Sequence, residues 1–359
     1  MFSDRHYVPA IKWKQGEYMA LEELKPHHKP HLTPLVDIPA IPWDFKEERP
    51  AKSIDSHLDK IAEQMVKAWG AERSIFVDLG LVEPGVRMSG GEHPVDWLFD
   101  KLASAGVQAI PVTGTDRDRA YQNAVAVVAG RDQQGFCLRA EPDDFQDQAS
   151  VDILVGLIDG FGINRTSIDL ILDMGAITAG QSGLMARVVA SALALLAGAT
   201  DYRTLTVLSG AFPTDLSSVP KGLSVLPRAD WAMWLNLRSQ PLIRQPSFGD
   251  YTAAHPNPSE LDPRIIQASA SIRYAVDTEW VIARGRSLKS ASFGGYAQFN
   301  SLSGALIAHP LFTGASFSWS SDYVTACAAG GPTGNLTTWR KVATNRHLSR
   351  TAHQIANLP

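Results

Sequence analysis

Short runs of apolar and β-branched residues alternate with longer segments of helical periodicity along most of the chain. This alternation is typical of βα units, in which a buried strand is followed by an amphipathic helix. The runs predict eight strands, over residues 7–13, 32–38, 74–79, 108–114, 135–140, 168–173, 204–209 and 232–237. Because each run is almost continuously apolar, we expect parallel strands that are buried on both faces.

The intervening segments carry helix signals at their ends. Residues 54–69 place apolar side chains on one stripe, with Ser53 as the expected N-cap and Gly70 just beyond the end. Eight βα units in roughly 240 residues match the count and length of a TIM-like (β/α)8 barrel. The alternative is an open doubly wound sheet, but no GxGxxG nucleotide signature follows the first strand.

The pattern changes near residue 246, which divides the chain into a predicted barrel over 1–245 and a C-terminal extension over 246–359. We expect the extension to pack on the barrel and complete the same globular unit. Residues 248–251 have the composition of a turn, and 271–282 predict a strand pair or one long strand. Residues 338–358 predict a final helix with Thr337 as its N-cap.

Composition and charge narrow the class of protein. The 359 residues are 45% hydrophobic and 19% charged, a balance that excludes general disorder. A net charge of −4 is too small to attract a membrane or bulk nucleic acid. The final helix carries only basic charges, so it either docks on the acidic barrel or faces an anionic ligand; these charges are Arg340, Lys341, Arg346 and Arg350.

Three further features indicate a cytoplasmic protein. Cys137 and Cys327 are too few for a disulfide scaffold, and Cys137 lies within a predicted strand, as a core residue does. The most apolar stretch, residues 184–199, contains Arg187 and is shorter than a membrane span requires. The first residues have no signal-peptide pattern.

Polar side chains follow every predicted strand, where barrel enzymes place their working residues. They are Lys12, Lys14, Asp37, Asp78, Thr113, Arg139, Glu141, Asp173, Ser209, Asn236 and Arg238. The aspartates Asp37, Asp78 and Asp173 are candidate catalytic acids or bases, and Lys12 and Arg139 are candidate anion ligands. The alternative is structural, because aspartate after a strand is also a common turn former or helix cap.

A metal site is a weaker hypothesis. The three aspartates offer the oxygen ligands that Mg²⁺ and Mn²⁺ prefer, but their basic neighbours argue against an all-carboxylate cage. There is no HExxH motif, no Cys/His zinc spacing, no GxSxG elbow and no Walker-type loop. His27, His28 and His31 cluster in a proline-flanked segment that has the composition of an exposed connection. No cofactor is therefore predicted firmly.

Several short blocks at both ends of the chain resemble the Beta protein family. They are Tyr7–Tyr18 with Leu35–Pro39, Phe248–Tyr251 with His255-Pro256, Phe317–Tyr323, Thr338–Val342 and Asn345–His347. The resemblance covers nearly the whole chain. It implies a protein of phages and of mobile or defence-associated islands, for which we know of no settled biochemical activity.

The resemblance draws attention to residues outside the predicted strands. The tail has two interpretations: Trp319 and Trp339 pack it on the barrel with Arg340 paired to Asp322 or Asp250, or it covers the strand ends and completes the site. Gly16 allows a ligand to approach the backbone closely, which favours the second. The candidate substrate-binding residues are then Lys12, Lys14, Glu17, Arg139, Arg238, Asp250, Tyr251 and Arg340.

Three functions are compatible with these features. The first is an enzyme that acts on a phosphorylated or otherwise anionic small molecule, a nucleotide or a nucleic-acid end. The second is a non-catalytic interaction subunit or inhibitor in phage–bacterium conflict, with a protein partner. The third, a nucleic-acid binder that uses the basic helix, is disfavoured by the net charge. A pocket lined by Lys12, Asp37 and Arg139 would favour the enzyme, and a filled mouth with an exposed apolar patch would favour the interaction protein.

Overall fold

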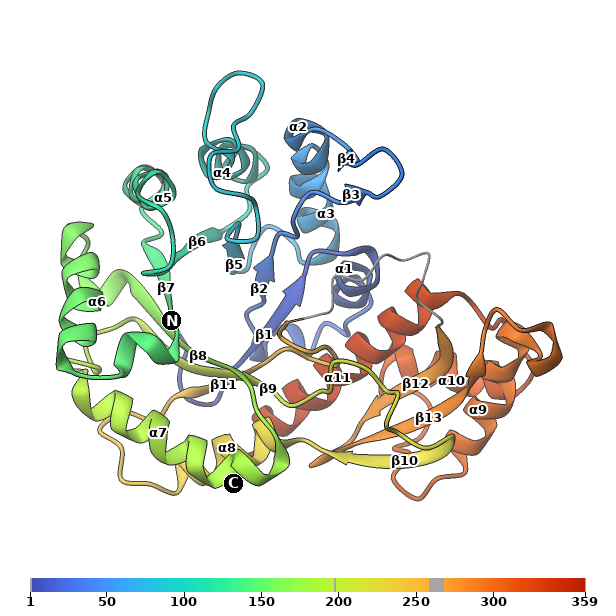
Figure 1. The fold of residues 1–359 in the computed structure, drawn as a ribbon. Coiled ribbons are helices and arrows are strands. Elements are labelled where there is room, and N and C mark those ends of the chain that lie inside the picture. Colours follow the sequence, from blue (N-terminus) through green and yellow to red (C-terminus); the bar gives the residue numbers. More distant parts are fainter. Residues whose placement is uncertain (1, 197, 258–267, 359) are drawn as a thin grey trace.

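The computed structural model describes residues 2–196, 198–257 and 268–358. Within them, eight parallel strands close into a barrel in the order β1-β11-β9-β8-β7-β6-β5-β2 (Figure 1). The strands are β1 Tyr7–Lys12, β2 Leu35–Asp37, β5 Ile75–Asp78, β6 Ala109–Thr113, β7 Phe136–Ala140, β8 Ile168–Ala176, β9 Thr204–Gly210 and β11 Ser247–Asp250. The predicted TIM-like α/β barrel is confirmed.

Helices surround the barrel as the apolar periodicity predicts (Figure 1). They are α1 Gln15–Glu22, α2 Ile54–Leu58, α3 Ile61–Ala68, α4 Pro94–Ser104, α5 Arg119–Asp132, α6 Gln148–Gly160, α7 Ser182–Leu195 and α8 Ala229–Arg238. Ser53 caps α2 by accepting a hydrogen bond from the Ser56 N–H, as expected. The single helix predicted over 54–69 is divided into α2 and α3. A short hairpin, β3 Trp43–Asp44 and β4 Arg49–Pro50, precedes them.

The predicted eighth strand is wrong. Residues 232–237 belong to helix α8, because Trp231, Trp234 and Leu237 recur at helical spacing and are all buried. The strand that closes the barrel is β11, in the segment predicted as a turn. Gly249 permits this pairing, since a Cβ there would lie 3.0 Å from the Val8 carbonyl oxygen. The last barrel strand therefore ends at Asp250, beyond the division drawn at residue 245.

The C-terminal unit contains a three-stranded antiparallel sheet in the order β10-β13-β12. Its strands are β10 Gly222–Pro227, β12 Ser269–Ala275 and β13 Glu279–Ser287, and its helices are α9 Gln298–Ile307, α10 Trp319–Ala328 and α11 Leu336–Ala356. β10 lies between β9 and α8 in sequence, so the chain leaves the barrel, contributes one strand to this sheet and returns. The predicted strand pair and final helix are confirmed, but Asn335 rather than Thr337 caps α11.

Helix α11 lies between the barrel and the C-terminal sheet (Figure 1). Its basic residues mostly dock on neighbouring elements: Lys341 pairs with Glu23 at 2.9 Å and Arg350 with Asp277. Arg346 donates to the Ala275 carbonyl oxygen at 2.7 Å. Contacts between α11 and its neighbouring elements therefore account for most of the positive charge of this helix. In the described parts of the chain, no helix combines the length and apolar character needed to cross a membrane.

Candidate active site

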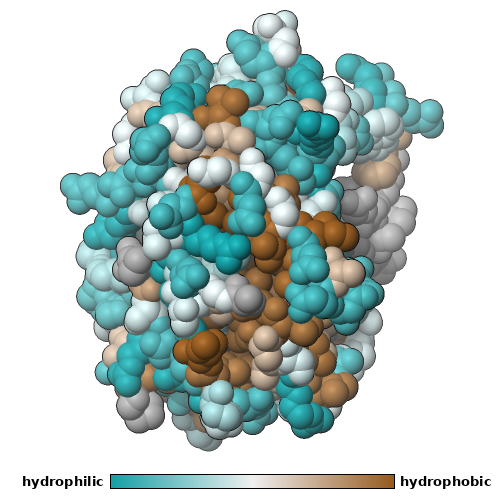
Figure 2. All heavy atoms as spheres, turned by 90° about the vertical axis from the view of Figure 1, so that its left-hand side faces the viewer, coloured by the Kyte–Doolittle hydropathy of each residue, from teal (hydrophilic) through white to brown (hydrophobic). Residues whose placement is uncertain are grey.

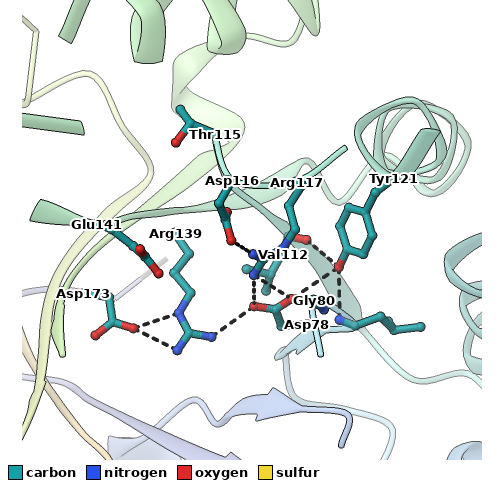
Figure 3. A network of polar contacts seen from close by, with 12 residues as sticks. Asp78, Gly80, Val112, Thr115, Asp116, Arg117, Tyr121, Arg139, Glu141 and Asp173 are labelled. Carbon is teal, nitrogen blue, oxygen red and sulfur yellow. Dashed lines mark hydrogen bonds and ion pairs between the residues drawn. The ribbon is translucent and has the colours of Figure 1, made fainter. Parts of the chain in front are cut away.

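Arg139 occupies the centre of a polar network at the carboxyl ends of the strands (Figure 3). Its Nε lies 2.9 Å from Asp173 Oδ2, and its Nη1 lies 2.8 Å from Asp37 Oδ1 and 3.0 Å from Asp78 Oδ2. Its Nη2 donates to the Tyr251 hydroxyl at 2.8 Å. Strands β2, β5, β7 and β8 end together here because parallel strands of a barrel share one carboxyl face. The structure thus brings Asp37, Asp78, Arg139 and Asp173, four of the predicted strand-end residues, together at this face.

Asp78 has a second cationic partner that the sequence did not indicate. Arg117, in the loop after β6, donates to Asp78 Oδ2 at 2.9 Å, and the Gly80 N–H donates to Asp78 Oδ1 at 2.7 Å (Figure 3). Burial by itself raises the pKa of Asp78, but attraction to Arg117 and Arg139 outweighs burial and lowers the pKa. Asp78 is therefore ionised at neutral pH and holds the two guanidinium groups in place.

Asp37 lies in a different electrostatic environment. It is 5% exposed, and burial raises its pKa despite the attraction of Arg139. The neighbouring carboxylates of Asp78 and Asp173 raise the pKa further. Two adjacent carboxyl groups with pKa values shifted in opposite directions are typical of acid–base sites. Asp37 therefore holds a proton more readily than Asp78 does.

Lys12 completes the network at the end of β1, where its Cα pairs in register with that of Asp37. Its side chain is partly buried, yet its amine makes no hydrogen bond or ion pair with any described residue. Burial lowers the pKa of Lys12, Asp37 opposes that shift, and Lys14 and Arg139 add to it. The amine therefore loses its proton more readily than an exposed lysine does.

Two cavities meet at this position. A cavity of about 330 Å³ lies over the strand ends, and its wall includes Arg139, Glu141 and Asp173. A larger cavity of about 690 Å³ lies between the barrel and the C-terminal unit. Lys12, Asp37 and Tyr251 belong to the walls of both cavities. A ligand in either cavity would reach the same lysine and carboxyl group.

The larger cavity carries an excess of positive charge. Five cationic side chains line it, against three acidic ones; the cations are Lys12, Lys14, Arg273, Arg284 and Arg340, and the acids are Glu17, Asp37 and Asp215. Arg273 of β12 and Arg340 of α11 both donate to the Ala253 carbonyl oxygen, at 2.7 and 3.3 Å. Burial, with repulsion from Arg340, lowers the pKa of Arg273 to about 9, so its guanidinium is still charged at neutral pH. A bound anion would relieve this repulsion.

Glu17 and Arg340 line the same cavity, with Arg340 Nε 3.6 Å from Glu17 Oε1. Arg340 is thus paired with Glu17 and not with Asp322 or Asp250. Trp339 stacks on Phe299 in the C-terminal core at 4.1 Å between ring centroids, while also contributing to the cavity wall. The tail is therefore packed in place and also covers one side of the site.

Three residues that the sequence placed at the site lie elsewhere. Arg238 is on helix α8 and pairs with Asp4 at 2.6 Å, so its expected position at the strand ends is wrong because residues 229–238 are helical. Asn236 is exposed on the same helix. Asp250 ends β11, but it contacts Tyr7 and His347 and lines neither cavity. Sequence position alone could not show on which side of the barrel wall this carboxylate lies.

The remaining candidates are accounted for as follows. Thr113 and Ser209 are fully buried, and their hydroxyl groups have no hydrogen-bond partner within the described residues. Cys137 is buried in β7. Across residues 2–196, 198–257 and 268–358, no group of three or more His, Cys, Asp or Glu side chains has an arrangement suited to a metal ion. Arg139 lies among the three aspartates, and a metal at this point stays an untested prediction.

Comparison with known proteins gives the chain a family. The sequence profile described as Beta protein matches residues 7–353. The chain belongs to the Beta protein family. Because the match runs from β1 into α11, the Beta protein profile includes the elements on both sides of the larger cavity.

Solved structures similar to this Beta protein include two enzymes. One is a mutant tryptophan synthase α-subunit from the hyperthermophile Pyrococcus furiosus, with 10% identity, a TM-score of 0.39 and coverage of 70% of this chain and 87% of that chain. The other is triosephosphate isomerase from Bartonella henselae, with 13% identity, a TM-score of 0.34 and coverage of 68% and 92%. No curated protein matches the chain.

Proposed function

We propose that this Beta protein is an enzyme that acts on an anionic small molecule bound at the carboxyl ends of the barrel strands. The observation that carries the proposal is the position of Lys12: its amine, which has no partner among the described residues, lies beside Asp37 in the wall shared by both cavities. Lys12 and Asp37 are the groups that exchange protons with the substrate. A metal ion plays no part in the proposal.

The anion binds in the larger cavity and not against Arg139. The guanidinium of Arg139 already contacts three carboxylates and a hydroxyl group, so it has little capacity left for a ligand. Arg273 has a backbone carbonyl as its hydrogen-bond partner within the described residues and no carboxylate within ion-pair distance. Lys14 is exposed at the same cavity. A phosphate or carboxylate group placed between Lys14, Arg273 and Arg340 would neutralise the excess charge.

The anion site is testable with ions that have no reactive group. Calorimetric titration with inorganic phosphate and with acetate should show binding to the wild type. Arg273→Gln and Arg340→Gln should each weaken binding by ~10- to 150-fold, the effect of losing one charge-assisted hydrogen bond worth ~1.5–3 kcal/mol. Arg73→Gln, which removes one positive charge beside a different cavity, is the matched control. Equal binding by all four proteins would contradict the proposal.

The resemblance to phage and defence proteins suggests where the activity operates, namely in cells under phage infection. If the proposal is correct, host cells that produce the wild type should differ from cells that produce Lys12→Met in plaque formation, at equal levels of folded protein. Unchanged plaque formation with Lys12→Met would show that the effect on phage does not depend on the cavity that Lys12 lines.

One observation favours the second candidate, a non-catalytic interaction protein. Large apolar side chains are exposed on three successive helices: Val127 of α5 at 62%, Ile153 of α6 at 67% and Leu184 of α7 at 54%. Hydrophobic side chains gather on this side of the molecule (Figure 2). Under this candidate, Ile153→Asp would abolish the effect on phage while Lys12→Met would retain it. The enzyme proposal predicts the reverse pattern.

A further inference from the structure

Lys12 differs from other lysines of the chain in what surrounds its amine. Lys29 is also partly buried, but its Nζ donates to the Ala68 carbonyl oxygen at 3.2 Å and lies over the Trp69 ring at 5.6 Å. Lys341 is paired with Glu23 at 2.9 Å. Lys12 has no such partner among the described residues, and it faces open space in two cavities. Its lone pair is therefore accessible to a ligand.

The groups around Lys12 make its ammonium ion easier to deprotonate than that of an exposed lysine. Arg139 and Lys14 are cations that act on it, and the carboxyl group of Asp37 opposes them. Partial burial and these cations lower the pKa of Lys12, as in lysines that act as nucleophiles. A lysine that served only to bind an anion would need no such depression.

We propose that the Lys12 amine adds to the carbonyl carbon of an aldehyde or ketone that carries a phosphate or carboxylate group, and forms an imine with it. The inference rests on the proposed function, since the anionic group would occupy the cavity lined by Lys14, Arg273 and Arg340. The carbonyl carbon would lie at the wall shared by the two cavities. The substrate class is thus an anionic carbonyl compound.

The chemistry needs no oxidant, reductant or second substrate. The Lys12 Nζ lone pair forms the C–N bond as the C=O π bond breaks, and the protonated Asp37 carboxyl group gives its proton to the carbonyl oxygen, which yields a carbinolamine protonated on nitrogen. The nitrogen gives a proton to the Asp37 carboxylate, and the Asp37 carboxyl group returns it to the hydroxyl group, which leaves as water. Burial raises the pKa of Asp37, so this carboxyl group can hold the proton between the two steps. Arg139 positions Asp37 through its 2.8 Å contact.

Borohydride reduction tests the imine directly, because it converts the C=N bond to a stable secondary amine. The probes are glycolaldehyde phosphate, glyoxylate and uncharged glycolaldehyde, each added to the full chain before reduction and peptide mass analysis. We expect the anionic probes to modify Lys12, with a gain equal to the mass of the probe less one oxygen atom. Labelling of Lys29 serves as the internal control for non-specific reaction. The anionic probe that labels Lys12 at the lower concentration identifies the anion as phosphate or carboxylate.

Variants of Lys12 and Arg273 test the nucleophile and the anion site independently. Lys12→Arg keeps the positive charge and should lose the adduct at this position, while labelling at Lys29 and the melting temperature stay unchanged. Arg273→Gln should lower labelling of Lys12 by the anionic probes by about tenfold or more and leave labelling by glycolaldehyde unchanged. Equal labelling by all three probes would overturn the anionic part of the inference.

Failure of the imine can be distinguished from failure of the proposed function. Labelling of Lys12 no greater than that of Lys29, with every probe, would overturn the imine. Phosphate binding by the same proteins then decides what remains. If it still depends on Arg273 and Arg340, the proposed anion site is supported, and Lys12 acts only as an acid, a base or a cation. If phosphate binding were also independent of these arginines, both proposals would fall.

Discussion

Two of the buried networks of arginine and aspartate in the described residues differ in their access to solvent. The mouth network joins Arg139 to Asp37, Asp78 and Asp173, and the Arg139 side chain is 12% exposed at a cavity. The seam network joins Asp250 to Arg228 of the barrel and His347 of α11, all with no exposed side-chain surface. Arginine and aspartate therefore line a cavity in the mouth network. In the seam network the same residue types are buried in the contact between the barrel and the C-terminal unit.

In the seam network the side chains of Asp250 and His347 have hydrogen-bond partners within the protein, whereas Arg228 Nε has none among the described residues. Trp280 Nε1 lies 3.2 Å from His347 Nδ1 and can only donate, so Nδ1 must be unprotonated. His347 Nε2 then carries the hydrogen and donates to Asp250 Oδ2 at 2.6 Å. Tyr7 donates to the other Asp250 oxygen at 2.5 Å. In the mouth, by contrast, the Lys12 amine has no partner among the described residues. This amine is the reason for proposing a catalytic role for the mouth and not for the seam.

The largest expected effect is on the stability of the seam. Asp250→Ala leaves Arg228 and His347 buried without their carboxylate, and we expect a loss of ~3–5 kcal/mol in the free energy of unfolding. Urea denaturation of the variant measures this loss. Asp277→Ala is the matched control, because it removes an exposed carboxylate that pairs with Arg350 of the same helix and should cost only ~0–1 kcal/mol. Similar losses of unfolding free energy in Asp250→Ala and Asp277→Ala would show that the buried seam pair contributes no more to stability than a surface pair.

Breaking the mouth network should cost less than breaking the seam. Arg139→Met leaves three carboxylates without their shared cation, but water in the adjoining cavity can solvate them, so we expect about 3 kcal/mol, the low end for a buried pair. The pKa of Asp78 is lowered, so its contribution to stability is present above its ordinary pKa and is lost as pH falls. The difference between wild type and variant should therefore shrink below about pH 4. A loss larger than that of Asp250→Ala would contradict the comparison.

A dependence on mildly acidic pH should distinguish the seam from the mouth. Burial lowers the pKa of His347 below its ordinary value of 6.5, so the unfolded chain binds the proton first and stability falls as pH decreases below 6.5. The cost is up to about 1.4 kcal/mol per pH unit for this one group. His6 and His28, with pKa values of about 3 and about 4, act in the same direction. His347→Gln should therefore reduce the slope of unfolding free energy against pH between 6.5 and 5 without abolishing it.

Urea denaturation at several pH values measures this slope. His309→Gln, which removes a histidine outside the seam, should keep the wild-type slope. A slope in His347→Gln equal to that of the wild type would show that His347 is already protonated when folded, and the hydrogen-bond assignment through Trp280 would be wrong.

The sequence predicted the parts of this architecture that depend on local pattern. Continuous apolar runs that end in a charged residue located β1, β2, β5 and β7, and with them Lys12, Asp37, Asp78 and Arg139. Strand β11 was missed because it has four residues and contains Gly249, which weakens any strand signal. Helix α8 was misassigned because its large aromatic residues are also common in strands.

The rest of the site depends on contacts that no local pattern contains. Arg117 lies on the loop after β6, and it reaches Asp78 because β6 pairs with β5 and the loop folds back over the strand ends. Arg273 comes from a C-terminal strand and meets Arg340 at Ala253 because α11 docks against α1. Arg228 precedes a helix that was predicted as a strand, so its ion pair with Asp250 could not be anticipated. The pairing of charges, and hence which cation is free to bind a ligand, required the tertiary structure.

The smallest expected effect on stability belongs to the residue with the largest expected effect on function. The Lys12 amine makes no hydrogen bond to a described residue, so Lys12→Met, which keeps most of the aliphatic stem, should change the free energy of unfolding by no more than ~0.5 kcal/mol, as at positions without specific partners. The same variant should lose the borohydride-trapped adduct and the effect on phage. Urea denaturation beside the trapping assay measures both quantities on one preparation. A loss of stability comparable to that of Arg139→Met would mean that Lys12 is a structural partner of Asp37, and the mouth would then differ from the seam only in its exposure to water.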